Sequence, residues 1–145
     1  MPVGYLDVPT GADLATKREL VKELYGAMHE VYPFPDDTRI FLREWPLDSV
    51  SQNGLLGSGP TRPVFIIHVP KDGNLDAKRT MLKKINAAVT KAYQLPNAER
   101  QDLHAAGHGY FAVFLHEHSL DTVVIDGDIL ADSQQRVEDQ RNAYA

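Results

Sequence analysis

Cysteine is absent from the 145 residues, and tryptophan occurs once. The chain therefore has no disulfide, no thiolate metal site and no cysteine nucleophile. It lacks an apolar run near the roughly 20 residues that span a bilayer, and it lacks the basic and then apolar N-terminal stretch of a secretory signal. Lys and Arg number 15 against 20 Asp and Glu, which argues against nucleic acid or a membrane surface as the main partner. These absences predict a cytoplasmic protein.

Two long stretches of the sequence repeat each other. Residues 2–35 match residues 63–96 at a constant offset of 61, with 11 of 34 pairs identical, and residues 40–54 match 113–127 with 7 of 15 pairs identical. Gapless matches of this length indicate a duplication. A content of 43% hydrophobic and 24% charged residues suits a single folded domain over 1–145. Its expected parts are repeat 1 at 2–54, a linker at 55–62, repeat 2 at 63–127 and a polar tail at 128–145 that is helical after Asp132.

Each repeat has the pattern of a β-α-β unit. Short apolar runs at 3–8 and 64–69 precede turn signals, and Asp13 and Asn74 stand at matching positions as N-caps of amphipathic helices. Prolines end both helices, because proline has no amide hydrogen to donate. A second apolar strand follows in each half, at 39–45 and 111–117. The sequence therefore predicts an α/β (α+β) fold, with one four-stranded sheet, two helices on one of its faces and parallel strands within each repeat.

The opposite face of the predicted sheet has no element left to cover it. The strands place isoleucine, valine and phenylalanine there, and the remaining tail is polar. An exposed apolar surface of that size predicts that the protein is an oligomer.

Besides the β-α-β duplication, the sequence has Pro2 directly after Met1, TRIFLREW at 38–45 and His29 late in the first helix. In these features the chain resembles the tautomerase superfamily, and within it the fused-repeat branch that includes cis-3-chloroacrylic acid dehalogenase. It implies a homotrimer that uses an N-terminal proline to act on a small carboxylate substrate, without a cofactor.

Pro2 is the strongest candidate for a catalytic residue. After removal of Met1 its nitrogen is a secondary amine on a rigid ring, and burial or nearby cations bring such an amine close to neutral pH, where a general base or acid works best. Pro63 occupies the matching position in the second repeat, but its nitrogen lies in a peptide bond. The duplication therefore predicts one working site in each chain. Retention of Met1 would remove the basicity of Pro2.

The resemblance suggests three residues that assist Pro2. Arg39 aligns with an arginine that tautomerases use on substrate, and His29 aligns with a substrate-binding histidine of the dehalogenase branch. Lys71 stands where that branch has its first substrate-binding arginine, whereas the second position reads Gly73-Asn74. Lysine supplies a point charge instead of a two-pronged guanidinium, so we expect looser recognition of a carboxylate.

The residues that activate water in the dehalogenase branch are changed. Its tyrosine aligns with Phe114, and its glutamate aligns with Ile125, next to Asp126. Phe114 is a candidate for lining an apolar pocket, and Asp126 or Glu117 for positioning water. Glu117 matches Glu44 in the first repeat, which favours a structural role for both.

Two metal-like spacings are weak. His104 and His108 have no evident third ligand, and His116 and His118 share one strand face. We expect no metal. The leading hypothesis is a tautomerase acting on a small 2-oxo or enol carboxylate. A hydratase, dehalogenase or decarboxylase, and a non-catalytic binding protein on the same scaffold, remain alternatives.

Overall fold

The computed structural model describes residues 2–33, 38–57, 62–71, 74–96 and 109–143. The first repeat contributes β1 (Val3–Pro9), α1 (Leu14–Val31), β2 (Arg39–Trp45), η1 (Leu47–Ser49), β3 (Ser51–Gln52) and β4 (Leu55–Leu56). The second repeat contributes β5 (Val64–Pro70), α2 (Leu75–Tyr93), β6 (Ala112–His118), η2 (Leu120–Thr122), β7 (Val124–Ile125) and β8 (Asp128–Ile129), followed by α4 (Leu130–Ala143). The four long strands start and end within one residue of the predicted positions.

One four-stranded sheet runs through both repeats in the order β2-β1-β5-β6. β1 and β2 are parallel, β5 and β6 are parallel, and β1 pairs with β5 in antiparallel fashion. Val3 pairs with His68, and Asp7 pairs with Val64. These two pairs exchange under the offset of 61, so a pseudo-twofold axis passes between β1 and β5. The predicted fold class and strand directions are confirmed.

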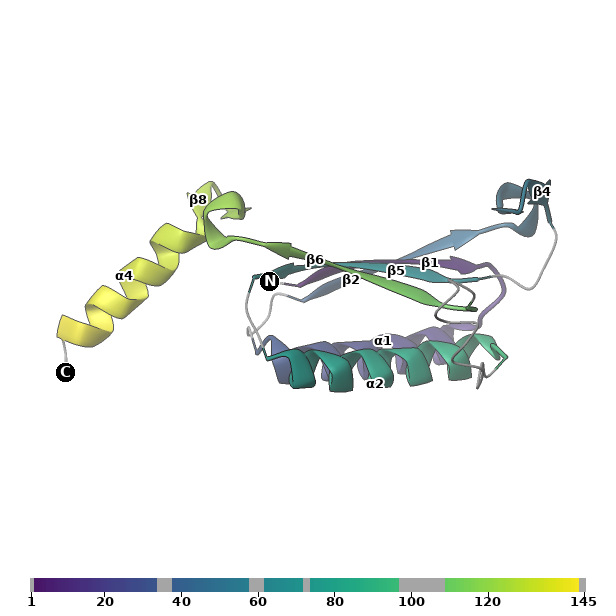
Figure 1. Ribbon diagram of the computed structural model, residues 1–145, viewed down its shortest axis with the longest axis horizontal. Coiled ribbons are helices and arrows are strands. Elements are labelled where there is room, and N and C mark those ends of the chain that lie inside the picture. Colours follow the sequence, from purple (N-terminus) through teal and green to yellow (C-terminus); the bar gives the residue numbers. More distant parts are fainter. Residues whose placement is uncertain (1, 34–37, 58–61, 72–73, 97–108, 144–145) are drawn as a thin grey trace.

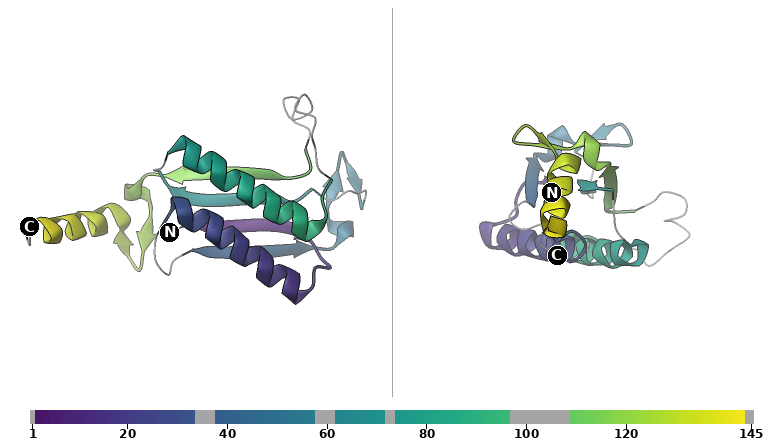
Figure 2. Two further views of the ribbon diagram at one scale, coloured as in Figure 1. Left: turned by 90° about the horizontal axis from the view of Figure 1, so that it is seen from below. Right: turned by 90° about the vertical axis from the view of Figure 1, so that its left-hand side faces the viewer.

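Helices α1 and α2 lie side by side on one face of the sheet (Figures 1 and 2). The core lies between the helices and that face, because alternate residues of β1 and β5 point toward the helices. The buried hydrophobic residues of this core come equally from both repeats: Leu6, Val8, Leu20, Leu24, Ala27, Met28, Tyr32, Phe65, Ile67, Val69, Met81, Ile85, Ala88 and Val89.

The helix starts follow the predicted caps. Asp13 accepts a hydrogen bond from the Thr16 amide at 2.7 Å, and this bond lowers the pKa of the Asp13 carboxyl. Asn74 accepts bonds from the amides of Asp76 and Ala77. Both helices therefore begin at equivalent positions of the two repeats.

Close packing at the pseudo-twofold axis depends on one glycine. Gly4 is buried on β1, and a Cβ added there would lie 2.4 Å from Cε1 of Phe65. Phe65 is the repeat equivalent of Gly4 and is fully buried. The two repeats therefore contribute unequally at this point, because the Phe65 ring of the second repeat packs against the backbone of Gly4 in the first.

Ion pairs connect the layers at equivalent places. Lys17 pairs with Glu44 at 2.8 Å, and Lys78 pairs with Glu117 in the same arrangement in the second repeat. Between the helices, Lys84 pairs with Glu30 at 2.6 Å, and Lys91 pairs with Glu23 at 3.2 Å.

The sheet face away from the helices carries an apolar row across all four strands. Phe41, Tyr5, Ile66 and Phe114 are neighbours in register, and the Tyr5 and Phe41 rings stack with centroids 5.3 Å apart. Phe41 is 48% exposed and Phe114 is 53% exposed. Within the described chain this face is uncovered, as the sequence predicts.

A short hairpin rises beyond the uncovered face at each end of the sheet (Figure 1). Each hairpin turns through two residues with positive φ, Asn53-Gly54 in β3–β4 and Asp126-Gly127 in β7–β8. The hairpins include Leu55–Leu56 and Asp128–Ile129, which the sequence placed in the linker and in the tail. Helix α4 then extends away from the sheet and starts before Asp132 (Figure 1). Among the described residues, no helix is long and apolar enough to cross a membrane.

Candidate functional site

Pro2 lies at the start of β1, at the end of the sheet where the β7–β8 hairpin stands (Figure 1). Its side chain is fully buried, and its carbonyl accepts a hydrogen bond from the Arg39 amide at 3.1 Å. Pro63 is also buried, and its carbonyl accepts from the Ala112 amide at 3.3 Å. The backbone thus holds the two prolines in the same way at equivalent ends of β1 and β5.

A cavity of about 370 Å³ begins one residue beyond Pro2, at Val3. It lies on the uncovered face, between the paired ends of β1 and β5 and the segment that leads from β6 into α4. We call it the Pro2-end cavity. Its lining is largely apolar, with a few polar groups: Val3, Tyr5, His68, Val69, Pro70, His118, Thr122, Val123, Val124 and Leu130.

Two histidines in this cavity form a hydrogen bond with each other. Nδ1 of His68 lies 2.9 Å from Nε2 of His118, and the His116 ring contacts His68 edge-on with centroids 5.1 Å apart. Burial lowers the pKa of His68 below its usual 6.5, and the neighbouring His118 and His116 lower it further. His68 is therefore neutral at pH 7.

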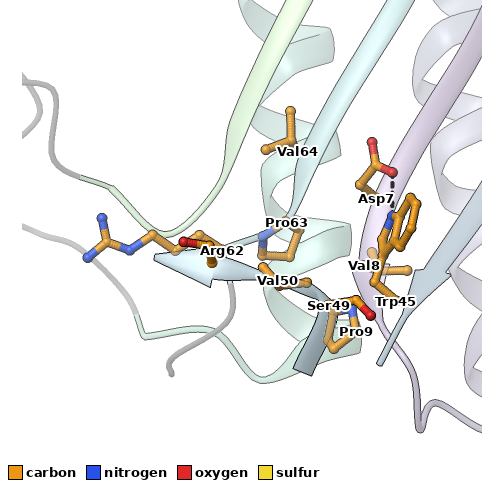
Figure 3. A pocket seen from close by; sticks show the side chains of 10 residues that line it. Asp7, Val8, Pro9, Trp45, Ser49, Val50, Arg62, Pro63 and Val64 are labelled. Carbon is orange, nitrogen blue, oxygen red and sulfur yellow. Dashed lines mark hydrogen bonds between the residues drawn. The ribbon is translucent and has the colours of Figure 1, made fainter. Parts of the chain in front are cut away.

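A second cavity of about 410 Å³ occupies the equivalent place at the other end of the sheet. We call it the Pro63-end cavity, and Figure 3 shows its lining, including Pro63 and Val64. Here Nε1 of Trp45 donates to one oxygen of Asp7 at 2.7 Å, and Arg43 donates to the other at 2.7 Å. Asp7, Arg43 and Trp45 are the repeat equivalents of His68, His116 and His118, so the same three positions carry different chemistry in the two repeats.

Comparison with known proteins finds likeness at the level of structure. No protein-family model matches the sequence, and no curated protein matches it significantly. The F6 fused 4-OT wild-type asymmetric trimer is 17% identical, with a TM-score of 0.74 over 90% of this chain and 98% of that one. Native fused 4-OT is 20% identical, with a TM-score of 0.73 over 90% and 97%. N1, a member of the cis-3-chloroacrylic acid dehalogenase family, is 11% identical, with a TM-score of 0.67 over 94% and 99%.

The chain has the tautomerase fold. The predicted resemblance is thus confirmed for the fold, over nearly the whole length of each neighbour. On this fold, the candidate residues named from the sequence fall into two groups.

The first group gathers at the Pro2 end of the tautomerase fold. Arg39 is the parallel partner of Val3 and begins β2. The Lys71 amide donates to the His118 carbonyl at 2.7 Å, and Lys71 lines a small cavity of about 110 Å³ with Tyr32 and Pro70. His29 lies half-buried in the last turn of α1, stacked on Tyr25 with ring centroids 5.3 Å apart.

The second group comprises Phe114, Glu117 and Asp126. The lining of the Pro2-end cavity includes no member of either group. Phe114 lies in the middle of the uncovered face, paired with Ile66. Glu117 forms the ion pair with Lys78, and Asp126 is exposed at the turn of the β7–β8 hairpin. The places of these residues are those of Phe41, Glu44 and Asn53 in the first repeat.

The structure describes only one of the two histidine pairs with metal-like spacing, His116 and His118. His104 and His108 fall outside the described residues. Among the residues that are described, no group of three or more His, Asp or Glu side chains has an arrangement that could hold a metal ion.

Sequence reasoning missed His68. The signal lies in the repeated strand, where PVGYLDVP and PVFIIHVP each carry one ionisable residue of charged type, Asp7 in the first and His68 in the second. A polar residue kept within an otherwise apolar strand, but changed in type between the repeats, marks the position where the two cavities differ.

Proposed function

We propose that the protein is a proline-dependent tautomerase that interconverts the enol and keto forms of a small 2-oxo carboxylate. Pro2, with Met1 removed, acts as the general base and acid. Arg39 and Lys71 attract the carboxylate, and His29 assists at the end of α1. The tautomerase fold supports this proposal, because its neighbours include fused 4-OT.

The observation that carries the proposal is the contrast between Pro2 and Pro63. Both prolines are buried, and their carbonyls make equivalent hydrogen bonds. The ring nitrogen of Pro63 belongs to a peptide bond and has no basicity, whereas that of Pro2 becomes an amine once Met1 is removed. A free α-amino group ordinarily titrates near pH 8, roughly, and burial favours its neutral form, which suits proton transfer near pH 7.

The experiment measures enol-to-keto conversion of phenylenolpyruvate and of 2-hydroxymuconate. Intact-mass analysis first checks that the purified chain begins at Pro2. Wild type is then compared with Pro2→Ala, and with Pro63→Ala as the matched control from the second repeat. We expect activity in wild type and in the control, and a large loss in Pro2→Ala. Equal rates for wild type and Pro2→Ala would sink the proline mechanism.

A hydratase or dehalogenase is the second candidate, because the fold is also that of a cis-3-chloroacrylic acid dehalogenase family member. Such a reaction needs a carboxylate to position water. The carboxylate of Glu117 is engaged by Lys78, and Asp126 lies at an exposed turn. We therefore expect chloride release from cis-3-chloroacrylate to be far slower than tautomerisation, and a reversed ranking of the two rates would favour this candidate.

We further propose that the protein is a cytoplasmic homotrimer whose subunits meet on the uncovered sheet face. The apolar row of Phe41, Tyr5, Ile66 and Phe114 supports burial of that face, and a fused 4-OT neighbour is a trimer. Light scattering tests the assembly, and the mass of a monomer would contradict it.

A further inference from the structure

The hydrogen bond between His68 and His118 restricts how the two rings carry protons. It joins Nδ1 of His68 to Nε2 of His118 at 2.9 Å, so one of these nitrogens bears a hydrogen and the other offers a lone pair. A neutral imidazole has one N–H and one lone pair. The outer nitrogens, Nε2 of His68 and Nδ1 of His118, therefore present one donor and one acceptor. With both rings neutral, the pair is polar at both ends and carries no net charge.

The surroundings favour the neutral form of His68. Burial and the neighbouring imidazoles lower the pKa of His68. The rings in contact with His68 are those of Tyr5 on β1, with ring centroids 6.1 Å apart, and of His116 and His118 on β6. Among the described residues that line the cavity there is no carboxylate to stabilise an imidazolium. The rest of the Pro2-end cavity is mostly apolar, so a ligand there meets few other polar groups.

We propose that the His68–His118 pair binds the 2-oxygen of the substrate in the Pro2-end cavity, accepting a hydrogen bond from the enol hydroxyl and donating one to the ketone. This rests on the proposed tautomerase function and deepens it. The pair suits both forms of the substrate, because an enol oxygen carries a hydrogen and a ketone oxygen has lone pairs. It adds two residues to the site that the family resemblance did not name.

The protons balance across the pair. Conversion of enol to ketone breaks an O–H bond and forms a C–H bond. The proton from oxygen moves to the facing outer nitrogen, the shared proton moves to the other ring, and that ring releases a proton to water. Pro2 as its ammonium delivers a proton to carbon and takes one back from water. The pair ends in its opposite tautomer, with a donor facing the ketone oxygen, and proton exchange with water restores the first tautomer after the product leaves.

The Pro63-end cavity lacks such a pair. Both oxygens of Asp7 already accept hydrogen bonds, one from Trp45 and one from Arg43, and an indole has no lone pair to offer. The donor-and-acceptor pair therefore occurs at the end of the sheet that carries Pro2.

Binding is tested without turnover. Wild-type protein, labelled in its histidine rings, is titrated with phenylpyruvate at neutral pH and followed by NMR of the ring C–H signals. The signals of His68 and His118 are assigned from the variants His68→Asn and His118→Gln. We expect both signals to shift with increasing ligand. The proposal would be overturned if these two signals stay in place while other resonances report binding. It would also be overturned if no resonance shifts up to the highest soluble concentration of phenylpyruvate.

Kinetics test the role in the reaction. His68→Asn places an amide where Nδ1 of His68 was, and His118→Gln places one where Nε2 of His118 was. Each variant can keep the hydrogen bond between positions 68 and 118, but it lacks the outer ring nitrogen that would face the substrate. We expect each variant to lower kcat about 100-fold, as loss of a group that stabilises developing charge does, with a smaller change in KM. Trp45→Phe, which removes the equivalent bond at the other cavity, leaves kcat unchanged. Unchanged kcat in both histidine variants would overturn the proposal.

The proline mechanism and the role of the His68–His118 pair can fail separately. If Pro2→Ala loses activity while the histidine variants keep it, the tautomerase function stands and the role of the pair falls. If Pro2→Ala keeps full activity, the proline mechanism falls, and the NMR titration decides the role of the pair.

Discussion

The Pro2-end cavity and the Pro63-end cavity occupy equivalent places at opposite ends of one sheet, and three matched positions at or beside them share no residue type. His68, His116 and His118 line up with Asp7, Arg43 and Trp45. At the Pro63 end the three side chains hold each other in a charged and closed set of hydrogen bonds. At the Pro2 end His68 and His118 bond only to each other through one ring nitrogen each, which leaves the outer ring nitrogens for another partner.

Other matched positions keep the same interactions in both repeats. The contrast with the two cavities shows which residues have a structural role. The helix caps at Asp13 and Asn74, and the strand-to-helix ion pairs of Glu44 and Glu117, occur in both repeats. Features present in both halves serve the shared scaffold, whereas features present in one half are the candidates for chemistry.

The largest expected effect comes from making the two prolines alike. One alanine inserted between Met1 and Pro2 leaves the ring in the chain but turns its nitrogen into an amide. We expect kcat to fall by at least about 100-fold, since the amine that serves as general acid and base is lost. Steady-state assay of the insertion variant, with its fold checked by circular dichroism, measures the effect. Retained activity would show that the nitrogen of Pro2 transfers no proton in the reaction.

The next effect concerns Gly4 and Phe65, the unequal pair at the pseudo-twofold axis. Gly4→Ala places a methyl against the Phe65 ring, and we expect a loss of about 1–3 kcal/mol in the free energy of unfolding. Denaturant unfolding measures it. Phe65→Leu is then combined with Gly4→Ala, and the double variant should lose less than the sum of the two single variants. Strict additivity would contradict the contact.

The two strand-to-helix ion pairs should behave as equals. Glu44→Gln and Glu117→Gln each remove a partly exposed pair with lysine, and each should cost up to about 1 kcal/mol of unfolding free energy. Neither should change kcat, because both carboxylates serve the scaffold. A selective loss of activity in Glu117→Gln would restore the catalytic role that the sequence left open for it.

The smallest effect is the pH dependence contributed by His68. Its pKa is lower in the folded protein than the usual 6.5, so the unfolded chain binds a proton first as the pH falls. The contribution of His68 to stability is therefore full above about pH 7 and declines as the pH falls through 6.5 toward the folded value. Thermal unfolding of wild type and His68→Asn across this range measures it. A wild-type curve no steeper than that of the variant would contradict the shift.

Most of the fold could be predicted because each repeat carries the same local signals. The apolar strands, the caps and the prolines follow from short-range patterns, and the offset of 61 supplies the pairing of the halves. The sequence could not show that Leu55 and Asp128 belong to hairpins, because two-residue strands have no period to detect.

The candidate site could be predicted less completely than the fold. Pro2, Arg39 and Lys71 are at one end of the sheet, as alignment with the family suggests. The His68–His118 contact joins residues 50 apart on neighbouring strands, so it depends on the β5–β6 register. A strand face identifies which side chains share a surface, but the register decides which of them touch.

The crossed ion pairs between α1 and α2 bear on how the halves recognise each other. Glu23 and Glu30 on α1 face Lys91 and Lys84 on α2, and the offset of 61 exchanges these residues, acid for base. In a pair of identical first repeats the same places would set glutamate against glutamate, and in a pair of second repeats lysine against lysine. Each such pair adds little stability at an exposed site. The four charges nonetheless favour association of unlike repeats. Two repeats made as separate chains should therefore bind each other in preference to self-association.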